Sequence, residues 1–194
     1  MDFGFEFLCL TTSMFKKFNL KEDIAGQTQV KSSVQRNFRA KIVEQFPLLA
    51  PYIDDLIPKK DPVFLVKCLD RVNIISVNNK FLFFNSFDGP FFPSLYILHK
   101  YPDILPKLQV DRGAIKFVLK AADIMCPGLT SPGGNLPSES LPAETVVAIY
   151  AQGKEHAVAV GMTKMATDDM KKINKGIGVS NAHYLNDGLW KTLH

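Results

Sequence analysis

The chain has 194 residues, a formal net charge of +4 at pH 7 and a sequence pI near 8.9. Its 46% hydrophobic and 22% charged residues are typical of one large or two small folded domains and exclude a disordered protein. No apolar run reaches the roughly 20 residues of a membrane span. The slight positive charge permits a nucleic-acid partner but does not require one.

Residues 30–46 are predicted to form an amphipathic helix, with Ser32 or Ser33 as its N-cap and Pro47 as its end. Its apolar stripe recurs every four residues: Val34, Phe38, Ile42 and Phe46. Arg36 and Arg39 lie beside this stripe and are interpreted as part of a solvated face. A short second helix is expected over 52–57.

Three short runs rich in Val, Ile and Phe then favour β-strands over 63–68, 72–77 and 80–85. Asn78-Asn79 suits the tight turn between the last two, because Asn tolerates positive φ. A helix from an N-cap at Ser94 to about Lys100 completes a compact α+β unit that ends near Pro102.

Pro102 and Pro106 mark a boundary, after which a helix is expected over 112–122 with Asp111 as its N-cap. Its apolar stripe is Ile115, Val118, Leu119 and Ala122. A short strand at 124–126 leads into a loop over 127–142, which is rich in Gly, Pro, Ser and Thr.

The remaining segments favour strands over 145–151 and 155–162, joined by a turn at 152–154. Thr167 is predicted to cap a helix through Ile173, with Gly176 ending it. A final strand is expected within 183–190. Strands dominate this half, so a small barrel with short helices is the predicted fold.

The sequence contains no recognisable catalytic or metal-binding pattern. The four histidines lack metal-ligand spacing, and neither a nucleophile elbow nor a phosphate loop is present. The three cysteines are far apart, which favours buried thiols in a reducing compartment over a zinc site or a disulfide framework. We therefore expect no enzyme activity, no cofactor and no metal.

One cationic feature stands out on the helix after Asp111. Arg112, Lys116 and Lys120 recur every four residues, which on a continuous helix forms a basic stripe that a phosphate backbone would neutralise. Arg112 and Gly113 also lie in the first turn, where free backbone N–H groups favour an anion. A solvated helix face is the alternative interpretation.

Several motifs, in order along the chain, resemble the malignant T-cell-amplified sequence protein family and its fungal translation-machinery-associated relatives. The motifs are MFKKF at 14–18, PKKDP at 58–62, HKYP at 99–102, VDRGAIKFVL at 110–119, IMCPGLTSP at 124–132, NKGIG at 174–178 and HYLNDGLW at 183–190. The motifs at 110–119 and 124–132 are the longest and most specific of these.

The resemblance implies an α+β protein: an N-terminal extension at 1–13, a pre-PUA domain at 14–103 and a PUA pseudo-β-barrel with short helices at 104–190. It also implies a cytoplasmic, non-catalytic translation factor in initiation, reinitiation and ribosome recycling. The implied partners are the small ribosomal subunit, tRNA and a density-regulated-protein-like subunit, with no membrane partner.

The resemblance places an RNA-binding surface on the helix after the VDRGA motif and on the following Pro-Gly turn. The implied residues are Asp111, Arg112, Gly113, Ala114, Lys116, Lys120, Met125, Cys126, Pro127 and Gly128. Lys120-Ala121 depart from the family pattern of a small residue followed by Gly. The alternatives are a PUA-containing RNA-modification enzyme or subunit, and a protein-interaction scaffold.

Overall fold

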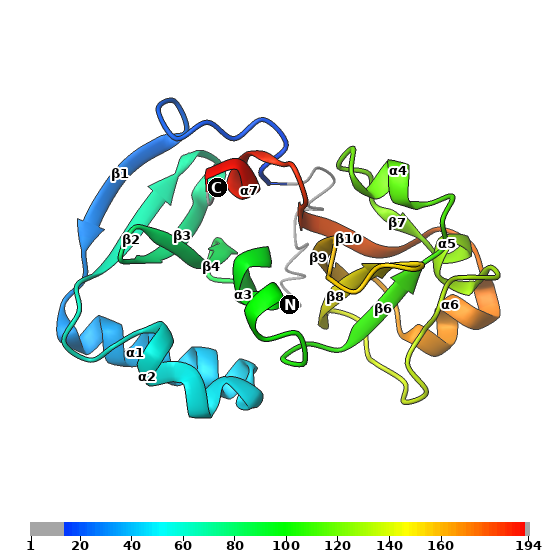
Figure 1. Ribbon diagram of the computed structural model, residues 1–194, viewed down its shortest axis with the longest axis horizontal. Helices are drawn as coiled ribbons and strands as arrows, with labels where there is room; N and C mark the ends of the chain where they lie inside the picture. The colour runs from blue at the N-terminus through cyan, green and yellow to red at the C-terminus, as the bar shows by residue number, and fades with distance from the viewer. Residues whose placement is uncertain (1–13, 193–194) are drawn as a thin grey trace, which may run out of the picture.

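The computed structural model describes residues 14–192, which form two five-stranded sheets, one in each half of the chain (Figure 1). Helices and strands occur in both halves, so the predicted α+β class is confirmed. The predicted extension at 1–13 lies outside the described residues. None of the helices within 14–192 is long and apolar enough to span a membrane.

The first sheet is antiparallel, and its strands follow the order β1-β2-β3-β4-β5. Their bounds are β1 Ile24–Gln29, β2 Val63–Cys68, β3 Val72–Val77, β4 Lys80–Ser86 and β5 Phe92–Pro93. Asn78 and Asn79 have φ of 50° and 60°, which confirms the predicted turn. The sequence did not reveal β1, because its residues are largely polar and exposed at the sheet edge.

The helices of this half are α1 Ser32–Gln45, α2 Ile53–Leu56 and α3 Leu95–Lys100, with 3-10 turns at Pro47–Tyr52 and Leu69–Arg71. Helix α1 departs from its predicted stripe at one end. Val34 is 38% exposed, whereas Ile42 and Phe46 are buried. Gln35 is buried instead, and its side-chain amide donates to the carbonyl of Pro58 at 2.6 Å.

Arg39 was wrongly assigned to a solvated face. Its side chain is only 13% exposed, and it donates to the backbone carbonyls of Ile53 and Ile57 and to the carboxylate of Asp54. It thereby gives the C-terminal end of α2 a side-chain donor: the carbonyl of Ile57, the C-cap, and that of Ile53, which also accepts the N–H of Ile57 at 2.9 Å. The Arg39 guanidinium lowers the pKa of Asp54 through their hydrogen bond.

We expect Arg39→Met to lower the free energy of unfolding by about 2 kcal/mol, because it removes the donor of these part-buried carbonyls. Arg36→Met on the exposed face of the same helix is the matched control and should change it by less than about 0.5 kcal/mol. Urea unfolding measures both variants. Equal effects of the two changes would contradict this role of Arg39.

The second sheet has the order β6-β8-β9-β10-β7, with β6 parallel to β8 and the other pairs antiparallel. Its strands are β6 Lys107–Val110, β7 Ile124–Met125, β8 Val146–Ala151, β9 Ala159–Thr163 and β10 Ile177–Tyr184. Its helices are α4 Ile115–Val118, α5 Cys126–Thr130, α6 Thr167–Ile173 and α7 Gly188–Thr192.

Several predictions for this half need correction. The strand expected within 183–190 is β10, which begins at Ile177, and the end of that segment forms α7 because Asp187 caps a helix there. The start of the expected 127–142 loop is helical, since Pro127 occupies the first turn of α5. Ala166, not Thr167, is the N-cap of α6, and left-handed Asn174 ends it.

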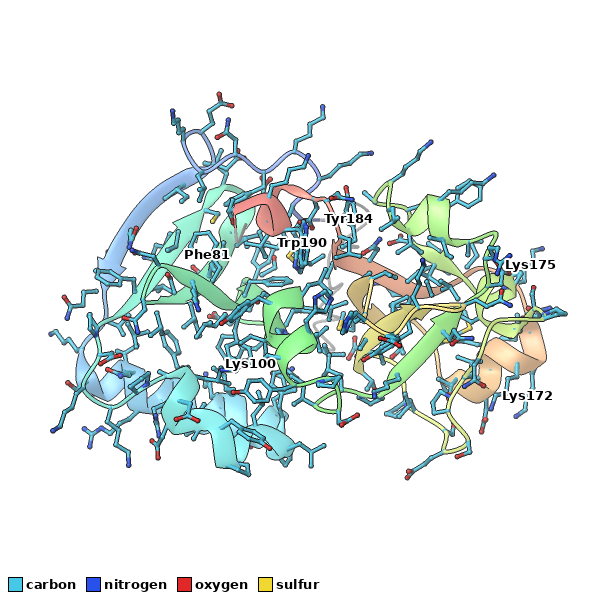
Figure 2. All side chains as sticks on the ribbon, viewed as in Figure 1. Phe81, Lys100, Lys172, Lys175, Tyr184 and Trp190 are labelled. Atoms are coloured by element: carbon cyan, nitrogen blue, oxygen red, sulfur yellow. The ribbon has the colours of Figure 1, made fainter. Side chains whose placement is uncertain are left out.

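The two halves share one hydrophobic core. Val146, Ala148 and Val160 of the second sheet belong to the same buried cluster as the side chains between the first sheet and its helices. Phe15 packs edge-on against Phe84 of β4, at 4.8 Å between ring centroids. Figure 2 shows Tyr184 and Trp190 between the two halves, which therefore form a continuous structure.

Candidate nucleic-acid interface

The corner between β6, α4 and α5 is built around Asp111. The backbone N–H of Asp111 donates to the carbonyl of Gly128 at 2.9 Å, and its Oδ1 accepts the N–H of Ala114 at 2.8 Å. A Cβ on residue 128 would lie 3.1 Å from the Cβ of Ala114, so glycine permits this close approach. Three of the predicted site residues thus hold the corner together.

Helix α4 is much shorter than predicted. It comprises only the four residues Ile115–Val118, and turns flank it on both sides. Ala121 adopts a left-handed φ of 71°, which ends the segment at the position where the family pattern has Gly. Arg112 therefore lies in the turn before the helix and Lys120 in the turn after it, so only Lys116 is on α4 and the predicted continuous basic stripe is wrong.

Two of the backbone N–H groups before α4 are already hydrogen-bonded within the protein. The N–H of Arg112 donates to the side chain of Gln152 at 3.2 Å, and the N–H of Ala114 is held by Asp111. A four-residue helix also has too small a dipole to favour an anion at its start. The exposed cationic side chains are therefore the main candidates for anion binding here.

Arg112, Lys116 and Lys120 are exposed. Within residues 14–192, none of the three forms a salt bridge with a carboxylate. Helix α4 lies in the second half of the molecule, on the side of β7 and β10 (Figure 1). The ammonium of Lys116 is 5.0 Å from the centre of the Phe117 ring. These cations are therefore available to a ligand from solvent.

An apolar groove of about 710 Å³ lies beside these cations, between α4, β7 and α5. Phe117, Ile124, Met125, Pro127 and Ile177 contribute to its walls. Phe117 and Met125 are 55% and 48% exposed, which is high for large apolar side chains. The groove joins predicted residues to others that the sequence prediction missed.

Seven residues that line the groove were missed by sequence reasoning: Phe117, Val118, Ala122, Asp123, Ile124, Ser131 and Ile177. Phe117 lies outside the apolar stripe of its helix, and an aromatic residue on a polar helix face is a usable signal for an exposed site. Ile177 comes from β10, 60 or so residues later, and reaches the groove only because β10 pairs with β7. Its contribution depends on tertiary structure.

Cys126 cannot contact a ligand with its side chain, which is fully buried beside the sulfur of Met165 at 3.9 Å. Burial raises the pKa of this thiol. Cys68 is also a buried free thiol, and burial raises its pKa to about 11, whereas Cys9 lies outside the described residues. The expectation of buried thiols is confirmed for these two cysteines.

Exposed lysines continue the cationic surface beyond the groove. The carbonyl of Gly176 accepts the N–H of Cys126 at 3.0 Å, which places the neighbouring Lys175 beside α5. Lys172, at the end of α6, is exposed at the same outer end of the second half (Figure 2). Within the described chain, no group of His, Cys, Asp and Glu has the arrangement of a metal site.

Comparison with known proteins agrees with this architecture. Residues 18–102 match the model of a pre-PUA-like domain, and residues 106–185 match that of a PUA domain. A hypothetical protein from Pyrococcus horikoshii OT3 has a similar fold, with a TM-score of 0.69, 22% identity and coverage of 87% of this chain and 100% of the other.

Sequence relatives are considerably more similar. The chain is 54% identical over 177 residues to malignant T-cell-amplified sequence 1-A of Xenopus laevis, covering 91% of this chain and 97% of the relative. It is 51% identical over 180 residues to translation machinery-associated protein 20 of Schizosaccharomyces pombe, covering 93% and 99%. With a pre-PUA domain followed by a PUA domain and relatives of this similarity, the chain belongs to the malignant T-cell-amplified sequence protein family.

Proposed function

We propose that the chain is a non-catalytic cytoplasmic translation factor that binds the small ribosomal subunit and tRNA through the α4–α5 corner of its PUA domain. In this proposal it promotes initiation, reinitiation and ribosome recycling together with a density-regulated-protein-like partner. The family and the PUA domain support the coarser part, a translation-associated RNA-binding protein.

The observation that carries the proposed site is the pairing of unneutralised cations with an apolar groove. Arg112 and Lys116 present positive charge without carboxylate partners in the described chain, as a phosphate backbone requires. Exposed Met125 and Pro127 lie beside them at the groove. Asp111, Gly113, Ala114, Cys126 and Gly128 are proposed to shape this surface, and Lys120 to extend it.

Co-sedimentation with purified small ribosomal subunits tests the proposal. If Arg112, Lys116 and Lys120 each neutralise about one phosphate of a single-stranded segment, the slope of log affinity against log salt should be roughly −2. Binding that is insensitive to salt would contradict an electrostatic RNA contact. Analysis of incubated tRNA for modified nucleosides separates this function from that of an RNA-modification enzyme, since a new modified base would contradict the non-catalytic role.

A further inference from the structure

Two carboxylates line the groove beside the cations: Asp111, whose Oδ1 accepts the N–H of Ala114 within the corner, and Asp123. Asp123 lines the groove, in the segment between α4 and β7. Its Oδ1 accepts the backbone N–H of Asn181 at 3.0 Å. Within residues 14–192 its carboxylate has no salt-bridge partner. An acidic group here repels phosphate, so a ligand must offer it something else.

The walls of the groove suit a planar apolar group better than they suit a phosphate. Phe117 and Met125 expose large apolar surfaces there, and bases stack favourably on aromatic side chains. Lys116 lies next to the Phe117 ring, where it can neutralise the phosphate of a nucleotide whose base enters the groove. An unpaired nucleobase therefore matches both the apolar walls and the adjacent charge.

Resting on the RNA-binding function proposed above, we propose that one unpaired nucleobase occupies this groove and that Asp123 selects cytosine over uracil. A carboxylate is an acceptor only. Cytosine presents an N4 amino group that can donate to it. Uracil carries an oxygen at the same position, as thymine does, and the carboxylate repels that oxygen.

The two pyrimidines have the same ring size, so the apolar walls contribute almost equally to both. The difference in their binding should therefore come mainly from the carboxylate. The cytosine complex gains a hydrogen bond to a charged group, whereas the uracil complex lacks that bond and adds repulsion. Because Asp123 is partly exposed to water, we expect a preference of about tenfold for cytosine.

Fluorescence anisotropy with labelled hexacytidylate and hexauridylate tests the selection in the full-length protein. The wild-type protein should bind hexacytidylate about tenfold more tightly. Asp123→Asn keeps an oxygen for the N–H of Asn181 but adds an amide donor for the uracil oxygen. This variant should bind both oligonucleotides with affinities within about twofold of each other, at an unchanged melting temperature.

Two matched variants complete the experiment. Glu139→Gln makes the same change in charge outside the groove and should keep the preference for cytosine. Phe117→Ala should weaken both oligonucleotides alike, since it removes stacking without touching the carboxylate. Equal wild-type affinities, or a preference that survives Asp123→Asn, would overturn the selection by Asp123 and leave the RNA-binding function standing. Failure of both oligonucleotides and of ribosomal subunits to bind would overturn the proposed function itself.

Discussion

Replacing Arg112 and Lys116 together with Glu is expected to lower affinity for small ribosomal subunits or tRNA on the order of 100-fold. The double change removes two cations and places two anions where phosphates are proposed to lie. Both side chains are exposed and neither forms a salt bridge in the described chain, so the fold should tolerate the change. Filter binding at a fixed salt concentration measures the effect.

The control must make the same change in charge away from the groove. Lys60 and Lys67 are exposed residues at and just before β2, a strand of the first sheet, whereas α4 lies in the other half of the molecule (Figure 1). Lys60→Glu with Lys67→Glu should reduce affinity by no more than a few-fold through the change in net charge. Equal losses in the two double variants would show that the corner is not the RNA site, provided that both proteins melt like the wild type.

The sequence predicts the regular parts of this fold because their signals are local. The bounds of β2 and β3 and the turn at Asn78-Asn79 agree with the structure, since β-branched runs and Asn conformations depend on near neighbours. Strand β1 escaped prediction because it is a polar edge strand, positioned by its pairing with β2. Arg39 was misjudged for a related reason, as its carbonyl partners come from the following helix.

For the candidate site, too, the sequence predicts the local features but not those that depend on tertiary structure. Lys116 and the Pro127-Gly128 pair of α5 are local features of two motifs and line one groove, and Arg112 lies in the chain between Asp111 and Gly113, which line it too. The length of α4 was overestimated, because the apolar stripe continues through turns that the left-handed Ala121 terminates. The groove itself depends on the pairing of β10 with β7, which no local pattern specifies.

The junction between the two halves contains a buried polar group whose role follows from its hydrogen bonds. Asp187 is 1% exposed, and its Oδ2 accepts the Nδ1–H of His183 at 2.7 Å and the N–H of Tyr184 at 3.1 Å. Its Oδ1 accepts the N–H of Trp190 at 2.9 Å and so caps α7. The rings of Phe15 and Phe84 enclose the other side of His183, each at 5.9 Å between centroids.

Asp187→Ala should therefore lower the free energy of unfolding by about 3–5 kcal/mol, because it leaves buried donors from β10 and α7 without an acceptor. For a chain of this size the melting temperature should fall by roughly 6–20 °C. Asp187→Asn keeps one acceptor oxygen and should lose about half as much stability. Calorimetry measures all three proteins, with Asp168→Ala in the exposed first turn of α6 as the surface control at under about 1 kcal/mol. If Asp187→Ala lowered the free energy of unfolding no more than that control, the carboxylate would not be what joins α7 to the rest of the protein.

Because His183 contacts aromatic rings from the first half, the loss of stability should appear as one transition for the whole chain and not as separate melting of its PUA domain.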